Sequence, residues 1–173
     1  MSMNMYPEHM RDKWPEQRRV WERRDAGLPD PKILVSGALG HIGSAVLRAW
    51  FGADLVALDN LSSQRLASLF HLPQRIPFIE ADILDADLDA ILREYKIDLV
   101  VHLAGLIDAE ASVKDPSRWT WVNGNGAARI FSACAAAKIP VIWPSTTSVY
   151  GTNQAIVSER SPLAPQSPYA VSK

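Results

Sequence analysis

The stretch that decides the fold is KILVSGALGHIG, residues 32–43, where an apolar run leads into a glycine-rich turn and then a helical pattern. The turn contains three glycines with two residues between each pair: Gly37, Gly40 and Gly43. The first permits a tight turn, the second lets the backbone approach a phosphate group, and the third lets the helix pack against the strand. The N–H groups of His41 and Ile42, at the start of the helix, would then face an anion. This context predicts a dinucleotide-binding loop, and the alternative is a glycine-rich turn without a ligand.

Short apolar runs and helical patterns alternate along the rest of the chain. The runs have the near-continuous hydrophobic content of strands covered on both faces, and they span residues 32–37, 54–59, 77–82, 98–105 and 140–146. The helical patterns span residues 41–51, 62–70, 85–95 and 116–138. Strands that alternate with helices imply right-handed crossovers and a parallel sheet. The sequence therefore predicts an α/β fold with a doubly wound parallel sheet, the NAD(P)-binding Rossmann fold.

Composition and charge restrict the class of protein. The 173 residues are 47% hydrophobic and 21% charged, which is typical of a globular chain with a core of its own. The net charge of −1 provides no field that would recruit nucleic acid or an anionic membrane. The single cysteine, Cys134, cannot form an internal disulfide or a cysteine-based zinc site. No apolar run approaches the ~20 residues of a membrane span, and the N-terminus lacks a secretory signal. We therefore expect a cytoplasmic protein with no metal, nucleic-acid or membrane partner.

The first 31 residues differ in character from the remainder, which indicates a domain border near Pro31. They are polar, rich in Arg and Trp, and without a strand pattern. Pro15 suits the first position of a short helix, and Gly27 with Pro29 supplies its end. We expect an arm that packs against its own domain or a neighbouring subunit, and the alternative is a helix that binds a partner or a lipid surface. Residues 32–173 would then form the dinucleotide-binding domain.

Two acidic residues close predicted strands. Asp59 ends the second strand, 22 positions after Gly37, close to where an acid accepts hydrogen bonds from the adenosine ribose hydroxyls. Such a carboxylate repels a 2′-phosphate, so the sequence predicts NAD rather than NADP; taken alone, Asp59 would be an ordinary turn residue. Asp82 ends the third strand and could accept a hydrogen bond from an adenine amino group. The alternative for Asp82 is a cap of the following helical segment.

The fourth predicted strand contains His102 and ends in residues that would leave room for a cofactor at the carboxyl edge of the sheet. These residues are Leu103, Ala104 and Gly105. We expect His102 to be a core histidine without a chemical role. Asn123 and Asn125 lie inside a helical pattern, where Asn is a poor helix former, and this position suggests a contact with the backbone or the cofactor.

The carboxyl-terminal part of the chain brings together hydroxyl groups, a tyrosine and a lysine. The fifth strand ends in Ser-Thr-Thr-Ser, residues 145–148, and Tyr169 precedes Lys173 by four positions. Residues four apart on a helix share one face, so the two side chains would meet. An ammonium group and a cationic nicotinamide both favour a phenolate and lower the tyrosine pKa from its usual value of about 10. The pattern indicates proton transfer by Tyr169, with a hydroxyl from the strand end bound to the substrate oxygen.

These motifs resemble those of the extended short-chain dehydrogenase/reductase family, in particular its NAD-dependent nucleotide-sugar epimerases and dehydratases. The resemblance covers residues 32–173. It implies a catalytic triad formed by Thr146, Tyr169 and Lys173. The positions that it implies for cofactor binding are Gly37, Gly40, His41, Ile42, Gly43, Asp59, Asn60, Asp82, Ile83, Leu103, Ala104, Gly105, Asn123, Tyr169 and Lys173.

Within this family the UDP-galactose (UDP-glucose) 4-epimerases are the most similar branch. Their pattern H-x-A-G-L…E-S-V…P is echoed by residues 102–116, and their N-x-N-G by residues 123–126. Two departures bear on the reaction. Ile107 stands where such epimerases often have a lysine that reaches cofactor and ribose oxygens. Thr147 and Ser148 follow the triad threonine where the 4,6-dehydratases have Asp-Glu for elimination, which disfavours dehydration.

The resemblance implies an NAD-dependent epimerase in which Tyr169 takes a proton from a sugar hydroxyl while NAD+ takes hydride from the same carbon. The alternatives are another reductase, dehydratase or decarboxylase of the family that acts on a nucleotide-sugar, and a non-catalytic dinucleotide-binding module. Family members continue past the triad lysine with a sixth strand and a substrate domain, which we expect to lie outside this chain. The implied partners are a nucleotide-sugar and either a second copy, through residues 85–95 and 116–138, or the missing carboxyl-terminal half. We expect no turnover of nucleotide-sugars by these 173 residues alone.

Overall fold

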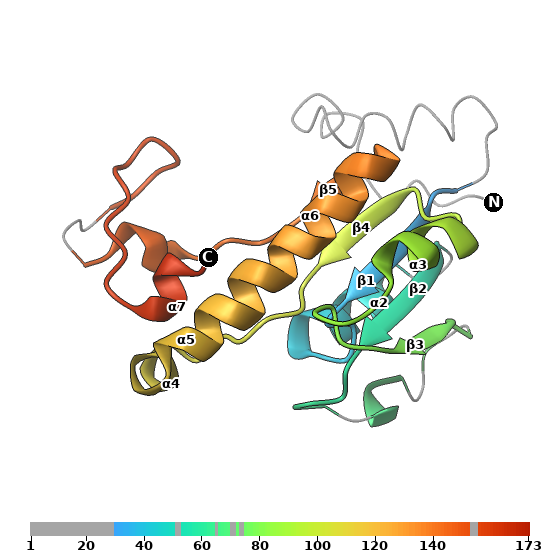
Figure 1. The fold of residues 1–173 in the computed structure, drawn as a ribbon, viewed down its shortest axis with the longest axis horizontal. Coiled ribbons are helices and arrows are strands. Elements are labelled where there is room, and N and C mark those ends of the chain that lie inside the picture. The colour runs from blue at the N-terminus through green and yellow to red at the C-terminus, as the bar shows by residue number, and fades with distance from the viewer. Residues whose placement is uncertain (1–29, 51–52, 65, 70–71, 73–74, 153–155) are drawn as a thin grey trace. The chain divides into compact units, whose positions relative to one another are not determined.

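The fold is taken from a computed structural model, which describes residues 30–50, 53–64, 66–69, 72, 75–152 and 156–173. The short helix expected around Pro15 lies outside the described residues. Contacts within the chain divide it into residues 1–31 and 32–173, and the architecture below is that of the second unit (Figure 1).

A parallel sheet organises this unit. Its described strands are β1 (Lys32–Ser36), β2 (Asp54–Asp59), β3 (Phe78–Glu80), β4 (Leu99–His102) and β5 (Val141–Ile142). They lie in the order β3-β2-β1-β4-β5, and every neighbouring pair is parallel. Leu34 at the centre of β1 is in register with Val56 of β2 and Val100 of β4, and all three are fully buried. The strand order reverses between β1 and β4, so their carboxyl ends form a topological switch point.

Helices cover both faces of the sheet, which confirms the predicted doubly wound arrangement. Helix α2 packs Leu47 against one face, beside Val35 of β1. Helices α3 and α6 pack Leu92 and Ile130 against the other face, beside Leu34 (Figure 1). The described helices are α2 (His41–Ala49), α3 (Leu88–Glu94), α4 (Ala109–Lys114), α5 (Pro116–Trp119), the π-helical segment η3 (Thr120–Asn125), α6 (Gly126–Ala137) and α7 (Pro168–Val171), with short 3₁₀ turns η2 (Leu66–Leu69) and η4 (Thr147–Tyr150).

The structure differs from the sequence prediction in two helical stretches. The described part of residues 62–70 forms only the turn η2, and the side chain of Asn60 accepts the Ser62 N–H at 3.0 Å, which favours a turn over a helix start. The stretch 116–138 consists of three consecutive pieces (α5, η3 and α6), and α4 precedes it without having been predicted. Asp115 separates α4 from α5 because a residue before proline is held outside the helical region, and its φ is −141°.

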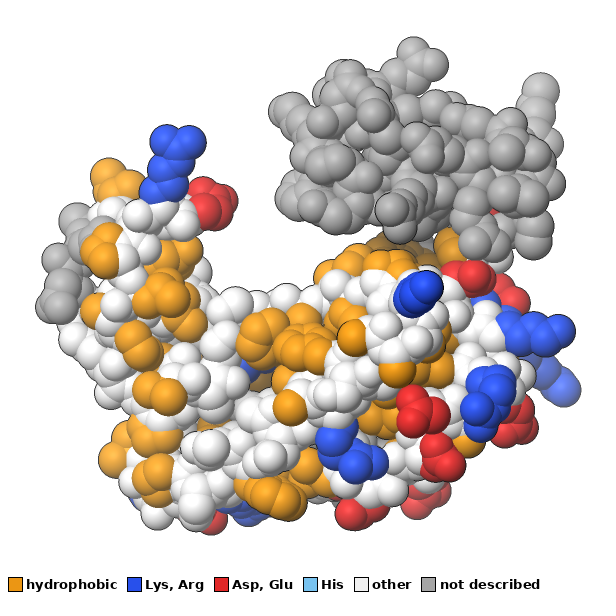
Figure 2. Space-filling view, turned by 45° about the horizontal axis from the view of Figure 1, so that its top comes forward, with side chains coloured by type: hydrophobic (Ala, Val, Ile, Leu, Met, Phe, Trp, Pro, Cys, Tyr) orange, Lys and Arg blue, Asp and Glu red, His pale blue; other side chains and the backbone are white. Residues whose placement is uncertain are grey.

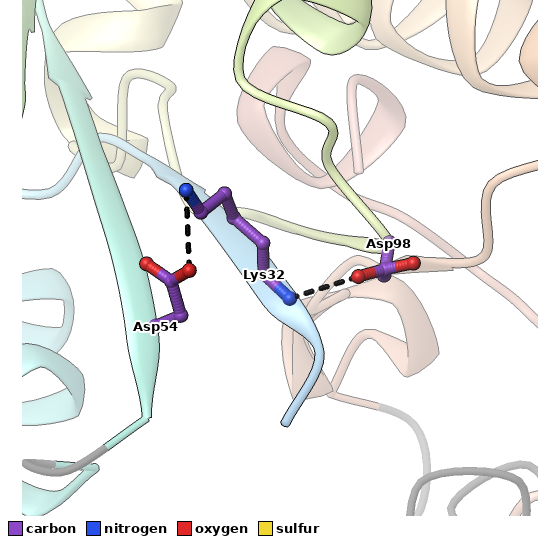
Figure 3. A network of polar contacts seen from close by, with 3 residues as sticks. All are labelled: Lys32, Asp54 and Asp98. Carbon is purple, nitrogen blue, oxygen red and sulfur yellow. Dashed lines mark hydrogen bonds and ion pairs between the residues drawn. The ribbon is translucent and has the colours of Figure 1, made fainter. Parts of the chain in front are cut away.

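The amino-terminal edge of the sheet is fixed by Lys32, the first residue of β1 (Figure 3). Its ammonium group lies 3.1 Å from the Asp54 carboxylate at the start of β2. Its backbone N–H donates to the Asp98 carboxylate at 3.0 Å, immediately before β4. These contacts align the starts of three neighbouring strands, at the edge opposite the switch point.

The surface contains charges of both signs. On the face shown in Figure 2, Lys and Arg side chains lie among Asp and Glu side chains, with hydrophobic side chains between them. Across the described residues, no helix is both long and apolar enough to cross a membrane.

Candidate cofactor and catalytic site

The glycine-rich turn lies at the switch point and is packed against the backbone that follows β4. Gly37 has a φ of +68°, and a Cβ atom at this position would lie 2.5 Å from the Ala104 nitrogen. A Cβ atom on Gly43 would overlap the Gly37 carbonyl oxygen and lie 2.7 Å from that of Ala38. Backbone atoms cannot move aside as a side chain can, so the turn requires glycine at both positions. The close packing brings the start of α2 directly over the carboxyl end of β1.

No side chain caps the amino end of α2, in contrast to α3, α4, α5 and α7. Its N-cap is Gly40, and its first turn contains no acidic residue. The N-cap side chains of α3, α4, α5 and α7 each accept a first-turn N–H, and they are Asp87, Asp108, Asp115 and Ser167. His41 and Ile42, in the first turn of α2, are exposed. Exposed, uncapped donors at the positive end of a nine-residue helix form an anion site, which suits a pyrophosphate.

Asp59 ends β2 and is buried beside the glycine-rich turn. One carboxylate oxygen accepts the Leu39 N–H at 3.0 Å, within the turn, and the other accepts the Leu61 N–H at 2.9 Å. Leu61 has a φ of +58°, which is uncommon for a residue with a side chain. Asp59 therefore holds the turn and the loop after β2 in place, a role that the sequence did not reveal. Each carboxylate oxygen can accept a second hydrogen bond, so capacity for a ribose diol remains.

Asp82 follows β3 and joins the ends of two strands. One of its oxygens accepts the Asn60 amide N–H at 2.8 Å, and the other accepts the backbone N–H two residues further on at 2.9 Å. Ile83 is buried in the core beside α6, where a Cβ atom on Gly126 would lie 2.6 Å from its Cδ1. Asn60, Asp82 and Ile83 thus form one structural unit beyond β2 and β3. Whether they also contact an adenine ring stays a prediction.

His102 ends β4 and is buried, as the sequence suggested for a core histidine. Its Nδ1 lies 2.7 Å from the Ser36 hydroxyl oxygen at the end of β1. Burial, with a smaller contribution from the positive charge of Lys173, lowers the pKa of His102 to about 4. The histidine is therefore neutral near pH 7, and its hydrogen bond with Ser36 joins the two strands of the switch point.

Asn123 holds the loop that follows β4. It is buried on η3; its side-chain oxygen accepts the Leu106 N–H at 2.7 Å, and its amide group donates to the Leu106 carbonyl at 2.9 Å. The same amide group donates to the Ser172 hydroxyl at 2.9 Å. A Cβ atom on Gly105 would lie 2.9 Å from the Asn123 oxygen, so the loop and the asparagine are closely packed. A π-helical turn is often found at a functional site, and here it carries an asparagine that connects two segments.

The three predicted catalytic residues come from neighbouring segments. Thr146 is the N-cap of η4, Tyr169 lies in α7, and η4 and α7 contact one another. The Ser145 hydroxyl donates to the Lys173 carbonyl oxygen at 3.1 Å, which connects the loop after β5 to the segment after α7. Lys173 follows two residues after Val171, the last residue of α7. In the part of the chain that the structure describes, no hydrogen bond joins the three side chains to one another.

Two residues near this triad were missed by the sequence analysis. The Lys173 ammonium lies 4.8 Å from the centre of the Trp143 ring, and Trp143 packs edge-on against Phe131 at 5.5 Å. Burial lowers the pKa of Lys173. The backbone N–H of Tyr169 donates to the buried Ser112 hydroxyl at 3.1 Å. Neither contact has a local sequence signal, because each joins residues far apart in the chain.

A groove of about 720 Å³ lies elsewhere, along α6 and the loop before α3. Its lining includes Trp121, Arg129 and residues 84–89, and none of the switch-point residues. Among the described residues, no group of three or more His, Cys, Asp and Glu side chains is placed to hold a metal ion.

The strand order and the glycine-rich turn at the switch point define a Rossmann-type dinucleotide-binding domain. Residues 33–173 match the NAD dependent epimerase/dehydratase family. The chain belongs to this family, which confirms the resemblance seen in the sequence.

Several proteins that are similar in sequence or structure are UDP-sugar 4-epimerases. The chain is 38% identical to a UDP-glucose 4-epimerase of Mycolicibacterium smegmatis, over 82% of this chain and 48% of the relative. It is 35% identical to a UDP-glucose 4-epimerase of Azospirillum brasilense, over 86% of this chain and 43% of the relative. The solved structure of the UDP-Glc/GlcNAc 4-epimerase of Campylobacter jejuni superposes with a TM-score of 0.79 and 33% identity, over 83% of this chain and 46% of that one. The chain thus spans about half the length of the relatives it matches.

Proposed function

We propose that the protein is an NAD-dependent nucleotide-sugar epimerase that inverts C4 of a UDP-hexose. The observation that carries the proposal is that the structure combines an uncapped, exposed α2 amino end with a Tyr169–Lys173 segment that is hydrogen-bonded to the loop after β5. The first feature suits a dinucleotide, and the second suits proton transfer at a hydroxyl group. The similarity to UDP-glucose 4-epimerases, at 35% and 38% identity, supports the choice of substrate.

The residues present fit NAD. The uncapped donors at His41 and Ile42 would bind the pyrophosphate, and the closely packed glycines let it approach the backbone. Asp59 would accept hydrogen bonds from the adenosine ribose, and its buried charge would repel the 2′-phosphate of NADP. Asp82 would lie at the adenine end, and Asn123 near the nicotinamide end. When bound, NAD would supply a hydride acceptor and then a hydride donor.

The protein's own groups would handle the proton. Tyr169 would remove it from the C4 hydroxyl of the sugar as hydride leaves the same carbon, which leaves a 4-keto sugar. The Thr146 hydroxyl would hold the reacting oxygen by a hydrogen bond. The Lys173 ammonium would stabilise the negative charge that develops on the Tyr169 oxygen. After the keto sugar turns its other face, hydride would return to C4 and Tyr169 would return the proton to the oxygen.

A second function within the family is dehydration, which needs an acid and a base for elimination. Thr147 and Ser148, which follow Thr146, supply no carboxyl group for that step. This absence favours epimerisation. We further propose a cytoplasmic homodimer formed through α3 and α6, where the groove lies, with residues 1–31 as an arm.

The direct test is interconversion of UDP-glucose and UDP-galactose by the intact protein with NAD. Tyr169→Phe should lower kcat by ~10²-fold or more with NAD affinity nearly unchanged, because it removes only the group that transfers the proton. Tyr95→Phe is the matched control, since Tyr95 packs in the core beside α3. Near-normal activity of Tyr169→Phe, or a product that has lost water instead of an epimer, would contradict the proposal.

A further inference from the structure

The amino end of α7, the helix that carries Tyr169, has backbone N–H groups that lack acceptors within the helix. Each N–H group in its first turn that lacks an acceptor within the helix has a different one. Pro168 has no N–H, and the Ala170 N–H donates to the Ser167 hydroxyl at 3.1 Å. The Tyr169 N–H has no partner within the helix and needs an acceptor from another element.

That acceptor is Ser112, which lies in helix α4. The Tyr169 N–H donates to its hydroxyl oxygen at 3.1 Å, across 57 positions of sequence. Ser112 is completely buried, and its hydroxyl donates its own proton to the Ala109 carbonyl at 2.5 Å. The proton is thereby directed away from Tyr169, which leaves an oxygen lone pair toward the Tyr169 N–H. The hydroxyl of Ser112 is thus held in the orientation that accepts from α7.

The carbonyl side of Tyr169 is held as well. The Ser172 hydroxyl donates to the Tyr169 carbonyl at 2.8 Å, and Asn123 donates to the Ser172 hydroxyl at 2.9 Å. Asn123 itself is fixed by two hydrogen bonds to Leu106. The two peptide groups that flank Tyr169 are therefore connected, from opposite sides, to α4 and to η3.

We propose that Ser112 is a positioning residue that sets the location of the Tyr169 phenol by capping α7 from α4. The inference rests on the proposed function, in which Tyr169 transfers a proton. Proton transfer requires the phenol within about 3 Å of the sugar hydroxyl, and the Lys173 ammonium can stabilise a phenolate only when it lies nearby. Without the Ser112 hydroxyl the Tyr169 N–H loses its acceptor. Helix α7 then shifts or frays, and the phenol moves away from both groups.

The test compares Ser112→Ala with Ser117→Ala, a control that removes an exposed serine hydroxyl on α5, bonded to Asp115. In UDP-hexose epimerisation, kcat of Ser112→Ala should fall ~10-fold, the effect of one lost hydrogen bond acting on the transition state. KM and the Kd for NAD should change by less than about 2-fold, because Ser112 contacts neither ligand.

A second measurement does not depend on catalysis. Hydrogen exchange of the Tyr169 amide should be at least ~10-fold faster in Ser112→Ala than in the wild type, and unchanged in Ser117→Ala. Unchanged exchange would overturn the inference, as would an unchanged kcat, or an equal loss of kcat and NAD affinity. If Tyr169→Phe stays active, the proposed function fails, whereas the exchange result still decides whether Ser112 holds α7.

Discussion

Replacing Asp59 with alanine tests whether its carboxylate holds the glycine-rich turn and the loop after β2 in place. Both carboxylate oxygens accept backbone N–H groups, from Leu39 at 3.0 Å and from Leu61 at 2.9 Å. A hydrogen bond to a charged group contributes about 1.5–3 kcal/mol. The bond from Leu39 should contribute more free energy than the bond from Leu61, because Leu39 is buried and Leu61 is half-buried. The expected loss in the free energy of unfolding is about 3 kcal/mol.

The assay is urea denaturation at pH 7, followed by circular dichroism, without NAD. Asp54→Ala is the matched control, since Asp54 begins the same strand and its carboxylate pairs with Lys32 in a half-exposed ion pair. Such pairs contribute up to about 1 kcal/mol, so the control should lose no more than that. An Asp59→Ala protein as stable as the control would refute the idea that this carboxylate holds the glycine-rich turn.

Two further predictions concern pH and the glycines. Stability should fall by about 1.4 kcal/mol per pH unit between about pH 6 and pH 4.5, because His102 has a pKa of about 4 when folded and near 6.5 when unfolded, so the unfolded state binds the proton first. Denaturation at several pH values should show this slope reduced in His102→Gln but not in His41→Gln, which changes an exposed histidine. Gly37→Ala should lose ~3 kcal/mol or more, because its φ is positive and its Cβ would meet backbone atoms, whereas Gly124→Ala, with open space around the new Cβ, should be unchanged or gain up to ~1 kcal/mol. Equal stabilities of the two glycine variants would contradict the packing described here.

The sequence predicted the sheet well because buried parallel strands have a strong local signal. Near-continuous apolar runs placed each strand, although β5 is shorter than its run of residues 140–146. The position of Asp59 at the end of β2 was predicted, whereas its hydrogen bonds to Leu39 and Leu61 were not, and its contact with the cofactor ribose stays a prediction. The helix expected over residues 62–70 failed because Asn60 offers the Ser62 N–H a competing partner.

The contacts that position the triad could not be predicted from the sequence. The bond between Ser112 and Tyr169 joins residues 57 positions apart, and a serine within an ordinary helix gives no sign of a distant partner. Trp143 is similar, because its contact with the Lys173 ammonium depends on how two distant segments pack. Local patterns report which elements form, whereas tertiary hydrogen bonds depend on how those elements meet.

The most direct test of the central claim is epimerisation of a UDP-hexose in deuterated water, with NMR detection at C4 of the sugar. In the proposed reaction the C4 hydrogen leaves and returns as hydride, and Tyr169 exchanges only the hydroxyl proton. The account therefore predicts that epimer forms while C4 keeps its original hydrogen. Deuterium at C4 of the epimer would show that a proton is removed from carbon, and this result would contradict the account.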